Sequence, residues 1–351
     1  MPREIHPMLA TLVEEPFDDP QWIYEVKWDG YRAVAFIAGG KATLVSRNQN
    51  DLTGEFAEIA AALGELRVDN AVIDGEVVAL DDEGRPSFSL MQQRTGMTSP
   101  GKRGPKNRAL PIVYYTFDLL YLNGYNLMGI ELERRKELLK QVVPEDKSLI
   151  RFSDHYPEQG TALYGVARDK GLEGIVAKLR TSVYVQKRSR EWLKIKITRR
   201  QECVIAGYTD PRGSRENFGS IVLGLYDPNG KFRHVGNAGS GFTEATHAAL
   251  WKRLKKLQTD RNPFAEKIES TRKPHWVKPE LVAEIKFSEW THEGERGGVK
   301  MRAPIYQGLR FDKKPRECVF EFPRSTEAEV KKAEAGEELT VLRKPEELSR
   351  E

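Results

Sequence analysis

The N-terminal part of the chain contains the stretch Trp22-Ile23-Tyr24-Glu25-Val26-Lys27-Trp28-Asp29-Gly30-Tyr31-Arg32. Strand-favouring residues flank its Asp-Gly pair, which predicts two strands joined by a hairpin turn at Asp29-Gly30. The hairpin would place Lys27 at a strand end, with Glu25 on the same strand face and Arg32 beside it. Such a lysine is a candidate nucleophile toward an activated phosphorus or carbonyl. The alternative, an ordinary solvent-exposed lysine, describes most lysines.

The length and charge of the chain set limits on what it can be. Its 351 residues suggest about two domains, each large enough for a core of its own. A net charge of +4 is too small to establish a nucleic-acid partner. Basic residues gather, however, in two clusters that could follow a polyphosphate or form a solvated face. The clusters are Lys102, Arg103, Lys106 and Arg108, and Lys187, Arg188, Arg190, Lys194, Lys196, Arg199 and Arg200.

Cysteine usage and the absence of long apolar segments point to a reducing compartment. Cys203 and Cys318 each lie in an apolar, strand-like run, which favours two buried free thiols over a disulfide. The spacing of cysteines and histidines does not resemble a zinc site. The first residues lack an apolar signal core, and no stretch of about twenty apolar residues occurs. A cytoplasmic protein without membrane contact is expected.

Several predicted strands carry isolated charged residues. The strand 71–80 contains Glu76, which either faces water from an edge strand or meets a polar partner, since burying it alone would be costly. The strand 112–122 contains Phe117, a core residue or a surface on which a base could stack. The other predicted strands of the first half lie at 41–46, which is followed by Arg47, and at 173–178. Helices are predicted at 54–66, around 88–94, at 131–143 and at 157–170. In the run 192–196, lysines alternate with apolar residues, which directs Lys194 and Lys196 to one face.

These residue types are those that a magnesium-bound nucleotide and its transferable phosphoryl group require. Cations suit the charge that develops on phosphate, carboxylates suit the metal and the ribose, and one amine suits the nucleophile. Neither Gly-x-x-x-x-Gly-Lys-Ser/Thr nor Gly-x-Gly-x-x-Gly occurs, so the common glycine loops do not hold the phosphates. A lysine nucleophile on an antiparallel scaffold accounts for both observations.

The order of these segments resembles the covalent nucleotidyltransferases, and most closely the ATP-dependent DNA ligases. Lys27-Trp28-Asp29-Gly30-Tyr31-Arg32 is similar to the family's lysine motif K-x-D-G-x-R. Later motifs of the family are matched, in order, by Ser46-Arg47-Asn48, Asp74-Gly75-Glu76, Phe117-Asp118, Glu173-Gly174-Ile175-Val176-Ala177-Lys178 and Trp192-Leu193-Lys194-Ile195-Lys196. The lysine motif alone is moderately specific, whereas the ordered set is very specific.

The resemblance implies a role for each matching residue. Lys27 would attack the α-phosphorus of ATP, release pyrophosphate and hold AMP as a phosphoramidate. Glu25 would meet the adenine amino group, Phe117 would stack on the ring and Glu76 would contact the ribose. Phosphates would be held by Arg32, Arg47, Arg188, Lys194 and Lys196, and Mg²⁺ or Mn²⁺ by Glu173, with Glu76. We further expect the cations Arg32, Arg47 and Lys194 to lower the pKa of Lys27.

The pattern changes near residue 198, where we expect a domain boundary. Short strands at 202–208, 220–226, 231–236, 281–287 and 319–322, with a helix at 242–257, predict an OB-type barrel over 199–324. The fold class is therefore α+β: a nucleotidyltransferase domain over 1–198, with antiparallel sheets flanked by helices, followed by that barrel. Residues 302–313 resemble the family's closing motif, in which Arg310, Asp312 and Lys313 would orient the departing pyrophosphate. Residues 325–351 are expected to form a charged, peripheral tail, part of which could be a solvated helix.

The resemblance covers roughly residues 7–323, and the second half most resembles the ligase module of bacterial end-joining ligase D. It implies a monomeric ligase that seals 5′-phosphate/3′-hydroxyl nicks in double-stranded DNA, in repair or end joining, at the nucleoid if the source is bacterial, with a Ku-like end-binding partner. The polymerase and phosphoesterase modules of the larger members do not occur in this sequence, nor does the helical DNA-binding domain of replicative ligases. Three alternatives remain at this point: an RNA ligase, a capping-type nucleotidyltransferase and a non-catalytic DNA-binding module.

Overall fold

The computed structural model describes residues 1–94, 110–143, 149–211, 217–264, 268, 273–292 and 298–339. The chain divides into two compact units. The first consists of Met1–Met91, Ala109–Ile197 and Phe322–Thr340, and the second is built mainly from Thr198–Glu321. The basic cluster of Lys102, Arg103, Lys106 and Arg108 lies outside the described residues.

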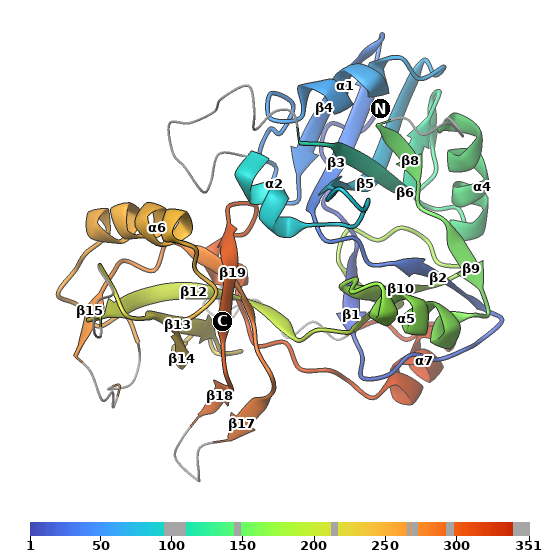
Figure 1. Cartoon of the computed structure of the whole chain (residues 1–351). Coiled ribbons are helices and arrows are strands. Elements are labelled where there is room, and N and C mark those ends of the chain that lie inside the picture. The colour runs from blue at the N-terminus through green and yellow to red at the C-terminus, as the bar shows by residue number, and fades with distance from the viewer. Residues whose placement is uncertain are drawn as a thin grey trace, which may run out of the picture. The chain divides into compact units, whose positions relative to one another are not determined.

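The first unit contains two sheets (Figure 1). One has the strand order β1-β11-β10-β2-β9, with β1 at Leu9–Leu12, β11 at Arg188–Lys196, β10 at Gly174–Leu179, β2 at Trp22–Val26 and β9 at His155–Pro157. The other has the order β4-β3-β5-β6-β7, with β4 at Lys41–Ser46, β3 at Tyr31–Ala38, β5 at Asn70–Ala79, β6 at Ile112–Leu122 and β7 at Tyr125–Asn126, and β8 at Ile150–Phe152 pairs with β6. Most of the pairings in both sheets are antiparallel, as the sequence predicts.

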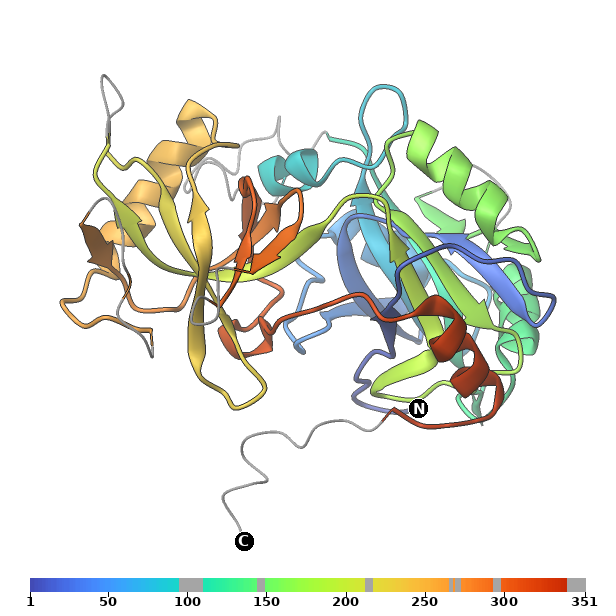
Figure 2. The same cartoon turned by 90° about the horizontal axis from the view of Figure 1, so that it is seen from below.

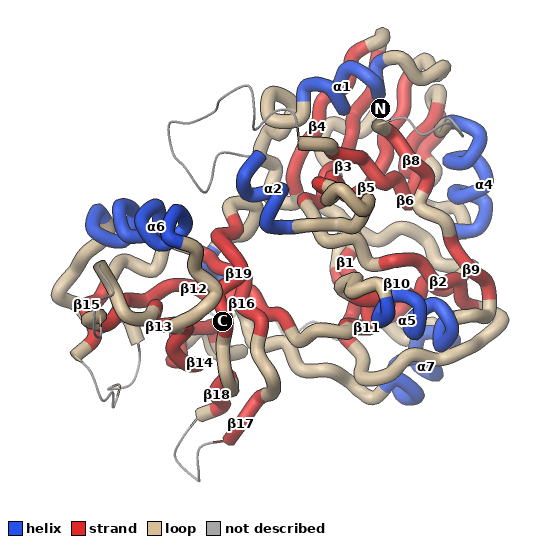
Figure 3. The backbone as a smooth tube through the Cα atoms, in the orientation of Figure 1, coloured by secondary structure: helices blue, strands red, loops and turns tan. Residues whose placement is uncertain are grey.

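Helices cover these two sheets (Figure 3). Helix α1, Ala57–Gly64, packs on β3 and β4, whereas α4, Leu132–Val142, packs on β6. Helix α5, Gly160–Asp169, covers β2 and β10. These helices, with the short α2 at Phe88–Arg94, agree with the predicted helical segments to within a few residues at their ends. The amphipathic spacing therefore located them correctly.

The predicted hairpin at Asp29-Gly30 is wrong, because β2 and β3 belong to different sheets. β2 instead pairs with β10 on one side and with β9 on the other. Four of its five residues are buried, which describes an interior strand rather than half of an exposed hairpin. Gly30 passes so close to β5 that a Cβ there would lie 2.0 Å from the carbonyl oxygen of Val77. The glycine is therefore required by packing between the sheets.

The core of the first unit shows how its two sheets meet. One cluster contains Val34, Val72 and Phe117 from the second sheet together with Trp192 from the first. The residues that the sequence assigns to the nucleotide are carried on these same strands, so the two sheets bring together segments that are far apart in the chain.

The second unit is a barrel of OB type, whose main path has five strands within the described residues and whose β15, Pro274–Trp276, pairs with β12 beside that path. Its strand order is β14-β13-β12-β16-β19, with β14 at Phe232–Ala238, β13 at Ile221–Tyr226, β12 at Arg200–Thr209, β16 at Val282–Lys286 and β19 at Ile305–Arg310. A bridge between Ser240 and Ile305 joins the two ends of this path, which closes the barrel. Helix α6, Glu244–Lys256, begins with a capping box formed by Thr243 and Thr246.

Several details of the second unit differ from the prediction. A strand at 319–322 was expected, but Val319 makes only an isolated bridge with Tyr226. Residues 302–313, for which no strand was predicted, contain β19. The sequence did not identify the short strands β15, Pro274–Trp276, β17, Trp290–His292, and β18, Val299–Met301. Cys203 and Cys318 are buried free thiols, as predicted.

The expected peripheral tail differs most from the structure. Thr326–Glu334 forms helix α7, which lies on β11 in the first unit (Figure 2). Its Ala333 belongs to the same core cluster as Ile175 of β10 and Leu163 of α5. The chain therefore passes from the second unit back to the first, while residues 340–351 lie outside the described part.

None of the helices within the described residues combines the length and apolar character that a membrane crossing needs.

Candidate active site

Lys27 lies directly after β2, and its backbone is fixed by β10. Its amide donates a hydrogen bond of 2.9 Å to the carbonyl oxygen of Gly174. Its ammonium group donates to the carboxylate of Glu173, the residue before β10. The side chain of Lys27 is 22% exposed, so a ligand can reach it from solvent, whereas Glu173 is buried. Lys27 and Glu173 are 146 positions apart in the chain, and the fold brings their side chains together as an amine–carboxylate pair.

The charge on Lys27 differs from the prediction. Burial disfavours the ammonium form, but Glu173 outweighs this effect and, with Asp29 and Glu76, raises the pKa of Lys27. The expected lowering of this pKa by Arg32, Arg47 and Lys194 is therefore wrong. The physical reason is proximity, since a carboxylate in hydrogen-bond contact acts more strongly than cations farther away.

Glu25 is the most enclosed of the predicted nucleotide ligands. It lies on β2, opposite Val176 of β10 and His155 of β9. Its carboxylate is 2.8 Å from the ammonium of Lys136 and 2.9 Å from that of Lys178. Burial opposes its ionisation, but these two lysines outweigh burial and hold the pKa of Glu25 below its usual value. Glu25 is therefore a permanent hydrogen-bond acceptor at neutral pH.

Lys178 is a buried cation that shares the environment of Phe117. Its ammonium lies 4.5 Å from the centroid of the Phe117 ring and 4.3 Å from that of Trp192. Burial lowers the pKa of Lys178 to about 8, although Glu25 opposes this shift. The Phe117 ring is buried in the core, and its assignment as a stacking surface for the base stays a prediction.

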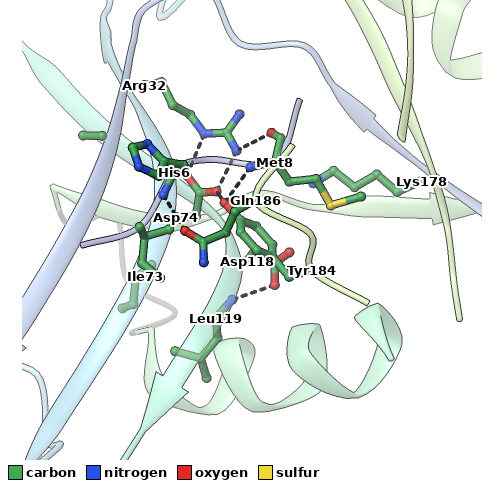
Figure 4. A network of polar contacts seen from close by, with 12 residues as sticks. His6, Met8, Arg32, Ile73, Asp74, Asp118, Leu119, Lys178, Tyr184 and Gln186 are labelled. Atoms are coloured by element: carbon green, nitrogen blue, oxygen red, sulfur yellow. Dashed lines mark hydrogen bonds and ion pairs between the residues drawn. The ribbon is translucent and has the colours of Figure 1, made fainter. Parts of the chain in front are cut away.

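Arg32 is held by a buried acid rather than pointing freely outward (Figure 4). Its Nε and Nη2 each donate to Asp74 over 2.6 Å, and Nη2 also reaches the carbonyl oxygen of Met8 at 3.3 Å. Tyr184 donates its hydroxyl to the same carboxylate over 2.5 Å. The guanidinium also lies 4.5 Å from the centre of the Phe117 ring. Asp74 and Tyr184 therefore orient a residue that the resemblance assigns to phosphate.

A second buried ion pair anchors helix α4 to the sheet. Arg135 donates to both oxygens of Asp118, over 2.7 and 2.9 Å, and all of these groups are inaccessible to solvent. A buried, doubly bonded pair of this kind fixes the direction from which the next helical residue, Lys136, approaches Glu25. Asp118 is thus a structural acid in this chain.

The remaining predicted residues occupy the surrounding strands. Glu76 is half-buried on β5, opposite Arg32 of β3. Arg47 follows β4 and is half-buried. Lys194 and Lys196 are half-buried on β11 with the buried Ile195 between them, which confirms the predicted alternation. Arg188, also on β11, donates to the carbonyl oxygen of Ala10. Their roles toward a nucleotide stay predictions.

The residues of the closing motif lie together within the second unit. Arg310, the last residue of β19, donates to both oxygens of Asp312, over 2.8 and 2.7 Å, and to Glu284 over 3.0 Å. Lys313 pairs with Glu202 at 3.0 Å. Each basic group therefore has an acidic partner in this structure. The proposed role of the motif toward pyrophosphate stays a prediction.

Two carboxylates near Lys27 are the residues that the resemblance assigns to a metal ion. Within the described chain, no cluster of three or more His, Cys, Asp or Glu residues is arranged to hold a metal ion. Glu173 and Glu76 both act on the charge of Lys27, so two carboxylates are available near the reactive amine. That donor set fits Mg²⁺, which commonly uses one or two carboxylates and completes its shell with water and substrate phosphates.

The sequence analysis did not identify Lys136, although a signal for it was present. In α4, Leu132, Arg135, Lys136 and Leu139 are the buried residues, at the i, i+3, i+4, i+7 spacing of an apolar stripe. A charged residue at such a position must find a buried partner. Lys136 finds Glu25. The partner itself could not be inferred, because the two residues are 111 positions apart.

Comparisons with known proteins agree with this geometry. Residues 7–196 match the family model of the ATP dependent DNA ligase domain, and residues 214–313 match that of the ATP dependent DNA ligase C terminal region. The chain is 32% identical to DNA ligase C1 of Mycolicibacterium smegmatis, over 90% of this chain and 93% of that protein. These matches do not favour the RNA-ligase, capping or non-catalytic alternatives.

Other relatives are longer. The chain is 37% identical to the multifunctional non-homologous end joining protein LigD of Pseudomonas aeruginosa, over 92% of this chain but only 37% of that protein. It thus spans less than half of the LigD relatives that it matches. Among solved structures, mycobacterial DNA ligase D complexed with ATP and MES is 34% identical, with a TM-score of 0.64, and the match covers 90% of this chain and 98% of that one.

Proposed function

Because this chain belongs to the ATP-dependent DNA ligase family, we propose that it seals 5′-phosphate/3′-hydroxyl nicks in double-stranded DNA through a lysyl-AMP on Lys27 and a DNA-adenylate. The observation that carries the proposal is the pairing of Lys27 with Glu173 at the end of β2, two residues after the buried acceptor Glu25. This arrangement supplies one amine for the attack, one carboxylate beside it for the metal, and one hydrogen-bond acceptor suited to the adenine base.

In the first step, the Lys27 amine forms a bond to the α-phosphorus of ATP while the bond from that phosphorus to pyrophosphate breaks. The amine must lose its proton to solvent before it attacks, and in the structure the carboxylate of Glu173 accepts the hydrogen bond of the ammonium and favours its charged form. A divalent cation held by Glu173 and Glu76 would neutralise phosphate charge. It would also neutralise the two carboxylates that raise the pKa of Lys27, and would thereby lower this pKa.

The other residues act by binding and orientation. Glu25 accepts a hydrogen bond from the adenine amino group, and Phe117 offers a ring to the base. Arg32, held by Asp74 and Tyr184, and the half-buried Lys194 and Lys196 offer positive charge to the phosphates. In the later steps the AMP moves to the 5′-phosphate of the nick, and the 3′-hydroxyl then displaces it.

The biological setting is a separate proposal, which rests on the names of the relatives. The LigD relatives are named for non-homologous end joining, and on that ground we assign this chain to DNA repair by end joining. A Ku-like end-binding partner, a monomeric state and an association with the nucleoid stay predictions.

The test is the intact mass of the protein after incubation with ATP and Mg²⁺, before and after addition of pyrophosphate, which reverses the first step. We expect the wild type to gain the mass of one AMP and to lose it with pyrophosphate. Lys27→Ala should gain nothing, whereas Lys41→Ala, which removes an exposed lysine from β4, should behave as the wild type. Full labelling of Lys27→Ala would overturn the assignment, and sealing of a nicked duplex by the wild type identifies the acceptor.

A further inference from the structure

The buried group of Glu25, Lys136 and Lys178 contains more positive charge than a carboxylate needs for pairing. The side chains of these residues are 2%, 1% and 3% exposed. Both ammonium groups approach the same carboxylate oxygen, Oε1. Within the described residues we find no hydrogen bond to Oε2 of Glu25. One oxygen of a fixed, ionised carboxylate is therefore left to accept a hydrogen bond from a ligand.

The two lysines hold Glu25 in different ways. Lys136 donates a regular hydrogen bond of 2.8 Å to Glu25 and another of 3.2 Å to the carbonyl oxygen of Ser153. Its ammonium also lies 4.6 Å from the centre of the Phe152 ring, so it is fixed at three points. Lys178 forms an ion pair with Glu25, but its ammonium makes no hydrogen bond of regular geometry among the described residues. Lys136 is thus the group that orients the carboxylate.

An oriented, ionised carboxylate distinguishes between purine bases by chemistry. The 6-amino group of adenine donates a hydrogen bond, whereas the 6-oxo group of guanine or hypoxanthine only accepts one. A buried acceptor facing another acceptor leaves both groups unsatisfied, and sites built around a specific hydrogen bond reject such analogues strongly. A protonated Glu25 could donate to the oxo group and would lose this discrimination.

We propose that Lys136 is a positioning residue that keeps Glu25 ionised and aimed at the 6-amino group, and that it thereby sets the preference of this enzyme for 6-aminopurine over 6-oxopurine nucleotides. The proposal rests on the proposed function, in which Glu25 meets the adenine. It adds a residue from helix α4 that does not itself touch the nucleotide and whose contribution passes entirely through Glu25.

The experiment compares lysyl-AMP formation with lysyl-IMP formation, using ATP and ITP as the two probes. Lys136→Met removes the charge and keeps most of the side-chain volume. We expect it to raise the KM for ATP about tenfold with a smaller effect on kcat, and to narrow the ATP-over-ITP preference by about the same factor. Lys140→Met, an exposed lysine one turn along the same helix, is the matched control and should keep both values.

Two further variants separate positioning from folding. Lys136→Arg retains a cation and should restore much of the preference, whereas Lys136→Gln can still donate a hydrogen bond but lacks the charge and should not. Thermal melting shows which variants are folded. If Lys136→Met and Lys136→Gln are folded and still prefer ATP over ITP by the wild-type factor, the proposal is overturned. A wild type that takes up no nucleotide at all would instead contradict the proposed function, so the two failures are distinguishable.

Discussion

At the scale of single residues, the electrostatics of the candidate active site depend on which carboxylate each cation contacts. Lys27 meets Glu173, Arg32 meets Asp74, and Lys136 meets Glu25. Each of these carboxylates is buried, so its charge acts more strongly than it would in water. A lysine motif read in isolation predicts an amine made reactive by neighbouring cations. The structure shows instead an amine whose charged form is favoured by its carboxylate partner.

His155 lies opposite Glu25 and yields a prediction about stability. Burial, reinforced by Lys136 and Lys178 and opposed by Glu25 and Asp154, lowers the pKa of His155 to about 4. An unfolded histidine titrates near about 6.5, so the unfolded chain binds the proton first as the pH falls. The stabilising effect of the neutral ring is complete above pH ~6.5 and is lost progressively toward pH ~4.

We therefore expect the wild type to lose more stability than His155→Gln when urea unfolding at pH 7.5 is compared with that at pH 5. The difference should be on the order of 1 kcal/mol, since the half-buried ring is partly screened by water. His6→Gln removes an exposed histidine and should show the pH response of the wild type. Equal losses in the wild type and His155→Gln would contradict the assignment.

At the scale of elements, helix α7 is the segment whose sequence is most misleading. Its composition is rich in Glu and Lys, yet it packs on β11, which carries Arg188, Lys194 and Lys196. Glu329 meets Arg190 of β11 at 2.9 Å, and Glu334 accepts a hydrogen bond of 3.0 Å from the indole of Trp22. The helix thus completes the core of the first unit rather than forming a tail.

Replacement of Glu329 tests this role. Glu329→Leu leaves the nearly buried Arg190 without its carboxylate, and removal of one partner from a buried pair costs about 3 kcal/mol. We expect a corresponding decrease in the free energy of unfolding and in the melting temperature. Glu327→Leu changes a glutamate that is 79% exposed on the same helix and should have little effect. Equal melting temperatures for Glu329→Leu and Glu327→Leu would contradict a stabilising contact between α7 and the first unit through Glu329.

At the scale of the whole molecule, charge distribution matters more than net charge. The chain carries 56 basic and 52 acidic residues, so the DNA binding that we propose requires local groups of basic residues. The basic cluster around β11 is partly committed to the fold, because Lys187 pairs with Glu338 and Arg190 with Glu329. Lys194 and Lys196 are half-buried on β11.

Salt dependence distinguishes DNA binding from nucleotide binding. We expect the affinity of Lys27→Ala for a nicked duplex, measured by fluorescence anisotropy, to fall by on the order of 10²-fold or more between 50 and 200 mM salt, as counterion release requires. Lysine adenylation of the wild type by ATP, which involves far fewer phosphates, should change much less. An affinity for DNA that does not respond to salt would argue against binding through the phosphate backbone.

The amino-acid sequence by itself determined the α+β class, most of the helices and strands of the first unit, and the assignment to the ligases. Local signals sufficed for these, because side-chain periodicity shows which face of an element is buried and ordered motifs need no structure. It did not determine which strands pair, because backbone hydrogen bonds look alike in every strand. The tertiary structure alone therefore separated β2 from β3, placed α7 on the first unit, paired Lys27 with Glu173 and brought Lys136 to Glu25. Each of these outcomes depends on contacts between residues distant in the chain, where burial and close approach decide the charge that a group carries.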